Sequence, residues 1–293
     1  MTLSDSSLAE IYDHRACTLG EGAFWHPLRQ QYFWFDIIGK RLLSVSDGEQ
    51  LQWQFNEHVS AAGWIDHSNL LIASESGLYH FNLEQGSKEL LVPLEADKPA
   101  NRSNDGRADP QGGFWIGTMG KRAEYEQGAL YRFYRGELRT LRTGLTIPNA
   151  ICFAPGGEFA YYADTVAGFL WRQALDKNSG WPVGDAQLLI DFKAQGQNPD
   201  GALTDAQGNI WNAQWGAGQV ACYSPQGEFL VAIATPSSQV TCPAFGGPDY
   251  TDLLITSATE NMTADQLKAE PTAGKTLIAK ACGQGKAEPQ VLL

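Results

Sequence analysis

Oxygen-bearing side chains stand at four well-separated places in the sequence: Glu21, Asn104 with Asp105, Asn149, and Asp200. Each place lies beside a run of residues that favours a short β-strand. Carboxylate and amide oxygens without His or Cys form the donor set that hard divalent cations such as Ca²⁺, Mg²⁺ or Mn²⁺ prefer. If the fold gathers these groups, their carboxylates repel one another and their pKa values rise unless a cation lies between them. The sequence therefore offers one candidate metal site, provided that the fold brings these places together.

A repeat along the chain predicts such a fold. Several segments, such as 109–117 and 205–213, share a polar, glycine-containing turn followed by an aromatic or β-branched strand. Similar openings elsewhere give six anchor positions, spaced by 41, 43, 44, 51 and 44 residues: Glu21, Ala62, Asp105, Asn149, Asp200 and Ala244. Six units of this length, each read as about four short strands, are typical of a β-propeller.

The propeller predicts where the anchors lie. The innermost strand of each blade lines the central channel, so the anchors should form a ring at one mouth of that channel. We therefore predict an all-β fold, a single six-bladed β-propeller domain over residues 1–293, with a metal site in the central channel. The alternative is a β-sandwich with recurring glycine turns, but it does not explain a period that persists from Glu21 to the end of the chain.

Composition limits the partners. The net charge is −12 and basic residues form only short pairs, which disfavours binding to nucleic acid or to an anionic membrane. No apolar run approaches the ~18–20 residues of a membrane span, and residues 1–21 contain no secretory-type apolar run. The five cysteines are far apart and form no Cys-x-x-Cys, which is typical of reduced, buried thiols and disfavours a cysteine zinc site. We expect a cytoplasmic protein with a small-molecule partner, and the oligomeric state stays open.

Other chemical signals are few. The chain has no Gly-x-Ser-x-Gly sequence, so an α/β-hydrolase triad is unsupported. All five histidines lie in the first 80 residues without a close pair, and we expect structural or surface roles for them. Trp215 lies in a glycine-rich segment after an inner strand and is a candidate for a pocket wall. The polar segment 260–275 predicts a loop, with a helical turn at Ala264–Ala269.

Five runs of residues, in order along most of the chain, carry a family resemblance. They are Gly20-Glu21-Gly22 with Trp25; Arg102-Ser-Asn-Asp-Gly106 with Asp109-Pro110 and Gly117-Thr-Met119; Gln127-Gly-Ala-Leu-Tyr131; Pro148-Asn149; and Pro199-Asp200-Gly201 with Gly208 and Trp211. These runs resemble the senescence-marker-protein/gluconolactonase family of regucalcin-like sugar lactonases. The resemblance implies a six-bladed propeller, one divalent ion (Ca²⁺, Mg²⁺, Mn²⁺ or Zn²⁺) and a sugar lactone as substrate.

The resemblance also implies a role for each matching residue. It makes Glu21, Asn149 and Asp200 the metal ligands. It makes Arg102 and Asn104 substrate contacts, with Asn104 close to the metal. For the residue that faces the metal in this segment, the repeat alone points to Asp105, whereas the family resemblance points to Asn104. Because a repeat register slips easily by one residue at a loop, we choose Asn104.

One segment departs from the family pattern. Some family members have acidic residues just after the Gly-Thr-Met segment, where this chain has Lys121 and Arg122. On a loop over the pocket, a basic pair would favour a lactone with an anionic group, such as a uronic, aldaric or sulfonated sugar. The alternative is that both side chains face solvent.

The implied reaction is metal-assisted hydrolysis of a sugar lactone to the sugar acid. The cation would bind the ring carbonyl oxygen and stabilise the tetrahedral oxyanion. Asp200 is the candidate general base, because it can reach both the metal and a water molecule. Two alternatives stay open, since fold alone does not set function: a metal-dependent phosphotriesterase-type hydrolase, and a non-enzymatic calcium-binding propeller.

Overall fold

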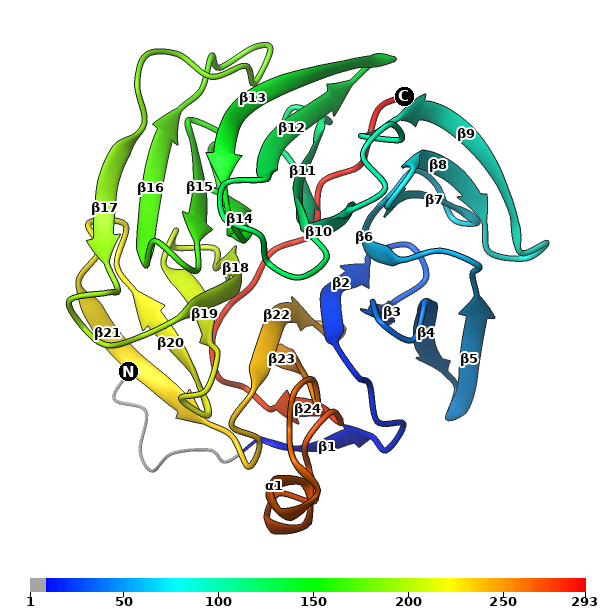
Figure 1. The fold of residues 1–293 in the computed structure, drawn as a ribbon, viewed down its shortest axis with the longest axis vertical. Helices are drawn as coiled ribbons and strands as arrows, with labels where there is room; N and C mark the ends of the chain where they lie inside the picture. Colours follow the sequence, from blue (N-terminus) through cyan, green and yellow to red (C-terminus); the bar gives the residue numbers. More distant parts are fainter. Residues whose placement is uncertain (1–8) are drawn as a thin grey trace.

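Six antiparallel sheets of four strands surround a central channel in the computed structural model, which describes residues 9–293 (Figure 1). In five of the sheets, strands consecutive in sequence pair as neighbours from the centre outward. The innermost strands of adjacent blades contact one another around the channel. This is the all-β, six-bladed propeller that the repeat predicts.

The strands of the first three blades are bounded as follows. Blade one contains β2 (Gly20–His26), β3 (Gln31–Asp36), β4 (Arg41–Ser46) and β5 (Glu49–Gln54). Blade two contains β6 (Val59–Trp64), β7 (Asn69–Ser74), β8 (Gly77–Asn82) and β9 (Ser87–Pro93). Blade three contains β10 (Asn101–Ala108), β11 (Phe114–Gly120), β12 (Gly128–Tyr134) and β13 (Glu137–Leu145).

The remaining blades complete the ring. Blade four contains β14 (Pro148–Phe153), β15 (Phe159–Asp164), β16 (Phe169–Ala174) and β17 (Gln187–Asp191). Blade five contains β18 (Pro199–Thr204), β19 (Ile210–Gln214), β20 (Gln219–Tyr223) and β21 (Phe229–Ala234). Blade six contains β22 (Val240–Gly246), β23 (Asp252–Ser257), β24 (Thr276–Ala279) and, as its outermost strand, β1 (Glu10–Asp13).

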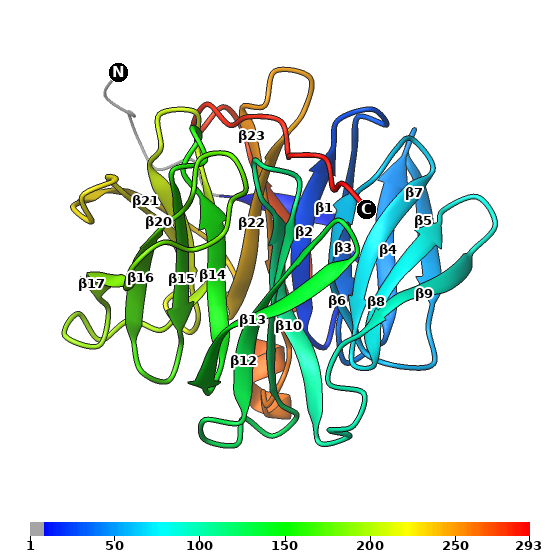
Figure 2. The ribbon, with the colours of Figure 1, turned by 90° about the horizontal axis from the view of Figure 1, so that it is seen from above.

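Both ends of the chain help to close the ring. β1 pairs antiparallel with β24, with Glu10 opposite Ile278, so the sixth blade combines strands from both ends of the chain. The segment after β24 then crosses one face of the propeller, opposite the face that carries α1 (Figure 2). There the backbone N–H groups of Val291 and Leu292 donate to the carbonyls of Trp64 and Gly112, at 2.9 and 2.8 Å.

Apolar side chains from neighbouring blades form the core. Trp34 and Trp115 are fully buried, and Trp211 of blade five packs edge-on against Phe245 of blade six with ring centroids 5.4 Å apart. Each such side chain removes a large apolar area from water, which stabilises the fold by about 2–3 kcal/mol per residue. Trp34, Trp115 and Trp211 each belong to a core cluster that two neighbouring blades share.

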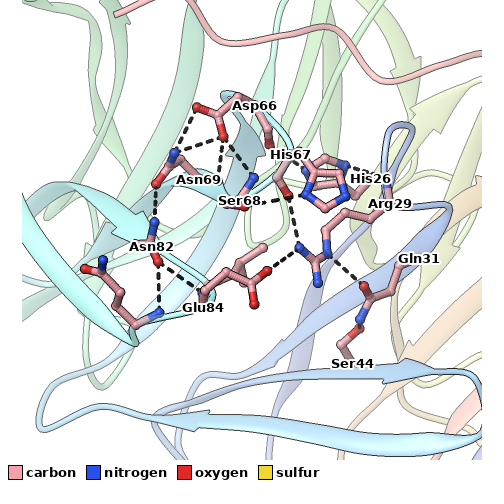
Figure 3. Close-up of polar contacts among 12 residues, drawn as sticks. His26, Arg29, Gln31, Ser44, Asp66, His67, Ser68, Asn69, Asn82 and Glu84 are labelled. Atoms are coloured by element: carbon pink, nitrogen blue, oxygen red, sulfur yellow. Dashed lines mark hydrogen bonds and ion pairs between the residues drawn. The ribbon is translucent and has the colours of Figure 1, made fainter.

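A polar network joins the β2–β3 turn of blade one to the β6–β7 turn of blade two (Figure 3). The Nε2 atom of His26 lies 2.9 Å from the carbonyl oxygen of Asp66, and the backbone N–H of Arg29 donates to Nδ1 at 3.3 Å. Because Nδ1 accepts this bond, the ring carries its proton on Nε2 and donates it to Asp66. The Arg29 guanidinium donates to the His67 carbonyl and to Glu84.

The long connection between β23 and β24 contains the helix of the described chain, α1 (Ala264–Ala269), as the sequence predicts. Thr263 caps its N-terminus in a reciprocal pair of hydrogen bonds with Gln266. No helix within residues 9–293 has the length and apolar character needed to cross a membrane. All five cysteines are buried and unpaired, in agreement with the prediction of free thiols.

Every innermost strand carries the same irregularity where it pairs with the second strand of its blade. In β2, Glu21 pairs with Phe35 and Phe24 pairs with Phe33, so three steps along β2 match two along β3. The same shift occurs at 59–62, 103–106, 149–152, 199–202 and 240–243. A bulge of this kind inserts one residue and re-aims the side chains beside it. The six blades therefore share a structural register.

The predicted anchors all lie in innermost strands, but they do not share one position in this register. Glu21 and Asn149 occupy the first position of the bulge, Asp200 the second, Asp105 the third and Ala62 the fourth, and Ala244 follows the fourth. The prediction of a single ring of equivalent residues is therefore wrong. Because all six blades carry the same bulge, the difference lies in the anchors themselves, which the sequence motifs place anywhere from the first position of the bulge to the residue after its fourth.

Candidate metal and substrate pocket

One mouth of the channel opens into a cavity of about 510 Å³. The cavity lies on the face reached by the loop between β23 and α1, whose residues Glu260 and Asn261 contribute to its wall. Its lining does not include Asp105, but it includes Trp215 and the residues predicted as metal ligands, substrate contacts and basic rim: Glu21, Arg102, Asn104, Lys121, Arg122, Asn149 and Asp200. The structure thus brings the predicted residues together, while their chemical roles stay predictions.

The bulges aim two pairs of side chains at this cavity in two different ways. In β2 and β14 the second residue of the bulge has a left-handed backbone conformation, with φ of 56° at Gly22 and 55° at Ala150. The side chain of the residue before it lines the cavity; these residues are Glu21 and Asn149. A Cβ at position 22 would lie 2.2 Å from the carbonyl oxygen of Ser60, so only glycine fits there. In β10 and β18 the second bulge residue itself lines the cavity; these residues are Asn104 and Asp200.

Glu21 and Asp200 form a buried acid pair in the lining of the cavity. The two residues are 4% and 5% exposed, and they lie close enough for each to shift the pKa of the other. Burial raises the pKa of Glu21, and the charge of Asp105 raises it further. Burial also raises the pKa of Asp200 well above its ordinary range, with the charge of Glu21 as the next cause. Both carboxyl groups ionise together only if positive charge lies beside them.

A guanidinium and two amides stand next to this acid pair. Arg102 is buried, and its Nη1 donates to Oδ1 of Asn104 at 2.7 Å and to the carbonyl oxygen of Ser103 at 2.9 Å. The Nδ2 of Asn104 donates to Oδ1 of Asn149 at 2.9 Å and to the carbonyl oxygen of Pro148 at 3.0 Å. Burial lowers the pKa of Arg102. The arrangement presents amide oxygen and guanidinium N–H groups along one side of the cavity.

Asp105 lies outside the cavity wall, in contrast to its neighbour Asn104. Its Oδ2 accepts a hydrogen bond from the backbone N–H of Ile151 at 2.7 Å. Burial raises the pKa of Asp105 to about 6, and the charge of Arg107 opposes this shift. The prediction from the repeat that Asp105 faces the site is therefore wrong, and the choice of Asn104 agrees with the structure.

Lys121 and Arg122 lie on the β11–β12 loop at the rim of the cavity. The Nζ of Lys121 donates to the carbonyl oxygen of Pro99 at 2.9 Å and lies 3.2 Å from Oε2 of Glu75. The Arg122 side chain is 89% exposed and pairs with Glu124 at 3.0 Å. Both charges therefore already have acidic partners, and the charge of Arg122 is largely solvated.

Sequence reasoning missed part of the cavity wall. Leu19, Met119 and Ile147 supply apolar surface beside Trp215, and Thr165 adds a hydroxyl. These residues lie in loops or at strand ends, where strand alternation cannot assign a side chain to a face. The predicted position of Trp215 in the wall is confirmed.

The donor set limits what the cavity can hold. Within the described residues 9–293, no three His, Cys, Asp or Glu side chains group as metal ligands. The cavity instead combines the buried carboxyl pair of Glu21 and Asp200 with amide oxygens, and a third carboxyl group, that of Glu260, lies in the wall. This is the chemistry of a hard, oxygen-seeking cation that keeps part of its coordination sphere for water or substrate.

Comparison with known families agrees with this arrangement. Residues 19–259, from just before β2 to the loop before α1, match the sequence profile of the SMP-30/Gluconolactonase/LRE-like region. The chain belongs to this family. The family resemblance seen in the sequence motifs is thereby confirmed, and the SMP-30/gluconolactonase match includes all of the predicted metal-binding and substrate-binding residues.

Relatives within the SMP-30/gluconolactonase family align over almost the whole chain. A putative sugar lactone lactonase from Rhizobium meliloti is 40% identical, covering 94% of both chains. A 6-deoxy-6-sulfogluconolactonase from Pseudomonas putida is 34% identical, covering 92% of this chain and 94% of its own. The crystal structure of a calcium-binding protein, regucalcin, from Agrobacterium tumefaciens has a TM-score of 0.95 at 38% identity, covering 97% of both chains.

Proposed function

We propose that this protein is a metal-dependent hydrolase that opens a sugar lactone to the sugar acid. The observation that carries the proposal is the convergence of Glu21, Asp200 and Asn149 in the lining of a cavity of about 510 Å³. This volume lies within the range of small-molecule sites, about 300–1,000 Å³. The names of the Rhizobium and Pseudomonas relatives support a lactone as the substrate class.

Three of the residues that line the cavity fit a divalent cation. Glu21 and Asp200 are buried side by side with raised pKa values, which is the electrostatic conflict that a cation relieves. We assign Glu21, Asn149 and Asp200 as its ligands. When bound, such an ion supplies a Lewis acid for a carbonyl oxygen and for the negative charge that develops there. The calcium-binding description of the Agrobacterium structure agrees with this assignment.

The chain's own residues supply orientation and proton transfer. Water adds to the lactone carbonyl carbon, the ring C–O bond breaks, and the released ring oxygen takes a proton. Asp200 is the proposed acceptor of the proton from water, since it lines the cavity as one of the proposed ligands and can reach both the cation and a water molecule. The Nε and Nη2 groups of Arg102 have no hydrogen-bond partner within residues 9–293, which leaves them to donate to substrate oxygens. Together with Asn104 they would align the lactone ring.

The basic rim is proposed to attract anionic lactones only weakly. Glu75 already offsets the charge of Lys121, and the guanidinium of Arg122 is solvated and paired with Glu124. An exposed charge steers an anion at long range and is screened by salt. The rim therefore suits a modest preference for an acidic or sulfonated sugar lactone over a neutral one.

A substrate panel tests the proposal. The protein is first treated with a chelator and is then assayed with and without added Ca²⁺, Mg²⁺, Mn²⁺ or Zn²⁺. The substrates are neutral aldonolactones, acidic sugar lactones and a phosphotriester. A pH indicator follows the acid that hydrolysis releases. Metal-dependent turnover of sugar lactones is the expected result. Turnover of the phosphotriester alone would instead identify a phosphotriesterase-type hydrolase. Metal binding without turnover of any substrate would identify a calcium-binding propeller.

A further inference from the structure

A directional chain of hydrogen bonds runs along the wall of the cavity from blade three to blade five. It begins at Arg102, passes through Asn104, Asn149 and Thr165, and ends at the backbone carbonyl of Pro199. The last two bonds are from Nδ2 of Asn149 to Oγ1 of Thr165, at 2.8 Å, and from Oγ1 of Thr165 to the oxygen of Pro199, at 2.7 Å. The chain therefore links the site residues of three successive blades.

The chemistry of the two ends fixes the direction of every link. Arg102 can only donate, so Asn104 must turn its oxygen toward the guanidinium and its NH₂ toward Asn149. The carbonyl of Pro199 can only accept, so the hydroxyl proton of Thr165 is committed to it. The hydroxyl oxygen is then left to accept from Nδ2 of Asn149. Both ends thus require Asn149 to turn its amide NH₂ toward Thr165 and its amide oxygen toward Nδ2 of Asn104.

Thr165 is held firmly enough to perform this role. Its backbone N–H donates to the carbonyl of Ile147 at 3.0 Å. The preceding residue, Asp164, is buried and accepts backbone hydrogen bonds from Thr146, Ile147 and Val166. The hydroxyl therefore stands on a rigid turn directly after β15, and it lines the cavity beside Asn149.

We infer that Thr165 is a positioning residue that orients the amide of Asn149 so that oxygen, and not NH₂, is offered to the cation. The inference rests on the proposed metal site, because only a cation distinguishes the two faces of the amide. An NH₂ group turned toward a cation would repel it and would remove a ligand. Partners that orient metal ligands in this way typically change metal affinity by about 10- to 100-fold when they are removed.

Calorimetric titration of metal-free protein with Ca²⁺ alone tests this role. Thr165→Val keeps the shape of the side chain and removes the hydroxyl, and it should weaken Ca²⁺ binding by about 10- to 100-fold. Thr165→Ser keeps the hydroxyl and should restore wild-type affinity. Thr204→Val is the matched control. Thr204 lies on β18, the strand of Asp200, and its buried hydroxyl donates to the carbonyl oxygen of Phe153 in the neighbouring blade four at 2.6 Å. Unlike Thr165, Thr204 does not line the cavity. Thermal unfolding of each metal-free variant shows that it is folded, and Thr204→Val should bind Ca²⁺ as the parent does.

A second pair of variants isolates orientation from any general loosening of the site. Asn149→Asp presents oxygen on both sides, so the orientation of residue 149 no longer matters. In that background Thr165→Val should leave Ca²⁺ affinity almost unchanged. The positioning role of Thr165 would be overturned if Thr165→Val weakened Ca²⁺ binding equally in the parent and in the Asn149→Asp background. It would also be overturned if Thr165→Val weakened Ca²⁺ binding in neither. Wild-type protein that binds neither Ca²⁺ nor Mg²⁺, Mn²⁺ or Zn²⁺ would instead refute the proposed metal site itself.

Discussion

Acidification should destabilise the fold through His26, whose ring lies fully buried between blades one and two (Figure 3). The pKa of His26 is lowered from 6.5 to about 4, chiefly by burial; the bond to the Asp66 carbonyl opposes this shift, and the nearby charge of Arg29 adds to it. Protonation also places a hydrogen on Nδ1, where the backbone N–H of Arg29 now donates. The charged ring therefore loses a hydrogen bond that the neutral ring makes.

The sign of the effect follows from which state binds the proton. Between pH 6.5 and about 4 the unfolded chain protonates this histidine while the folded protein does not, so the free energy of unfolding falls as the pH falls through this window. From pH 7 to pH 5 these pKa values correspond to a loss of about 2 kcal/mol. Because the hydrogen-bonded neighbours are partly solvated, screening reduces the expected loss to about 1–2 kcal/mol.

Urea denaturation of the parent and of His26→Gln at several pH values measures this loss. Glutamine can keep the donor to Asp66 and does not titrate, so the difference between the two proteins cancels the contributions of all other groups. From pH 7 to pH 5 the free energy of unfolding of the parent should fall by about 1–2 kcal/mol relative to that of His26→Gln. A difference between the two proteins that is the same at both pH values would refute the argument that His26 is held neutral by burial.

Two further predictions concern the rim of the cavity and the channel. Replacing Lys121 and Arg122 together with Ala should lower kcat/KM for an acidic sugar lactone by about 2- to 5-fold at low ionic strength and hardly at high ionic strength, because exposed charges are screened. Kinetics on acidic and neutral lactones check this, and equal changes for both would show that the pair does not sense substrate charge. Glu288→Ala leaves the buried guanidinium of Arg107 without its ion-pair partner and should lower the free energy of unfolding by about 3 kcal/mol, measured by urea denaturation. Unchanged stability would show that Arg107 finds another partner.

The repeat was predictable because its signal is local chemistry. The carboxylate of Asp109 accepts from the backbone of Gln111 and Gly113, and Gly112 adopts a φ of 90°. The same turn recurs at Asp205, which accepts from the backbone of Gln207 and Asn209. Such turns require particular residues at fixed offsets, so the sequence marks the places where a blade turns from its first strand to its second.

The register within the channel was less predictable because a bulge has no obligatory residue. Gly22 marks one bulge in the sequence, yet Ala150 adopts the same left-handed conformation without a glycine. The inserted residue then decides whether Asn104 or Asp105 faces the cavity. The partner of Lys121 was also hidden, since Glu75 comes from a different blade and only the folded loops bring the two together. The family motifs pointed to Asn104 as the residue that faces the cavity, which strand alternation alone did not.

The central claim is that Asp200 and a divalent ion act together in hydrolysing a sugar lactone. The most direct test is lactone turnover by parent protein and Asp200→Asn, each stripped with a chelator, dialysed and then titrated with Ca²⁺, Mg²⁺, Mn²⁺ or Zn²⁺. The parent should be inactive when stripped and regain turnover with at least one ion. Asp200→Asn should stay nearly inactive with every ion. Full turnover by the stripped parent, or parent-like activity in Asp200→Asn, would contradict the account.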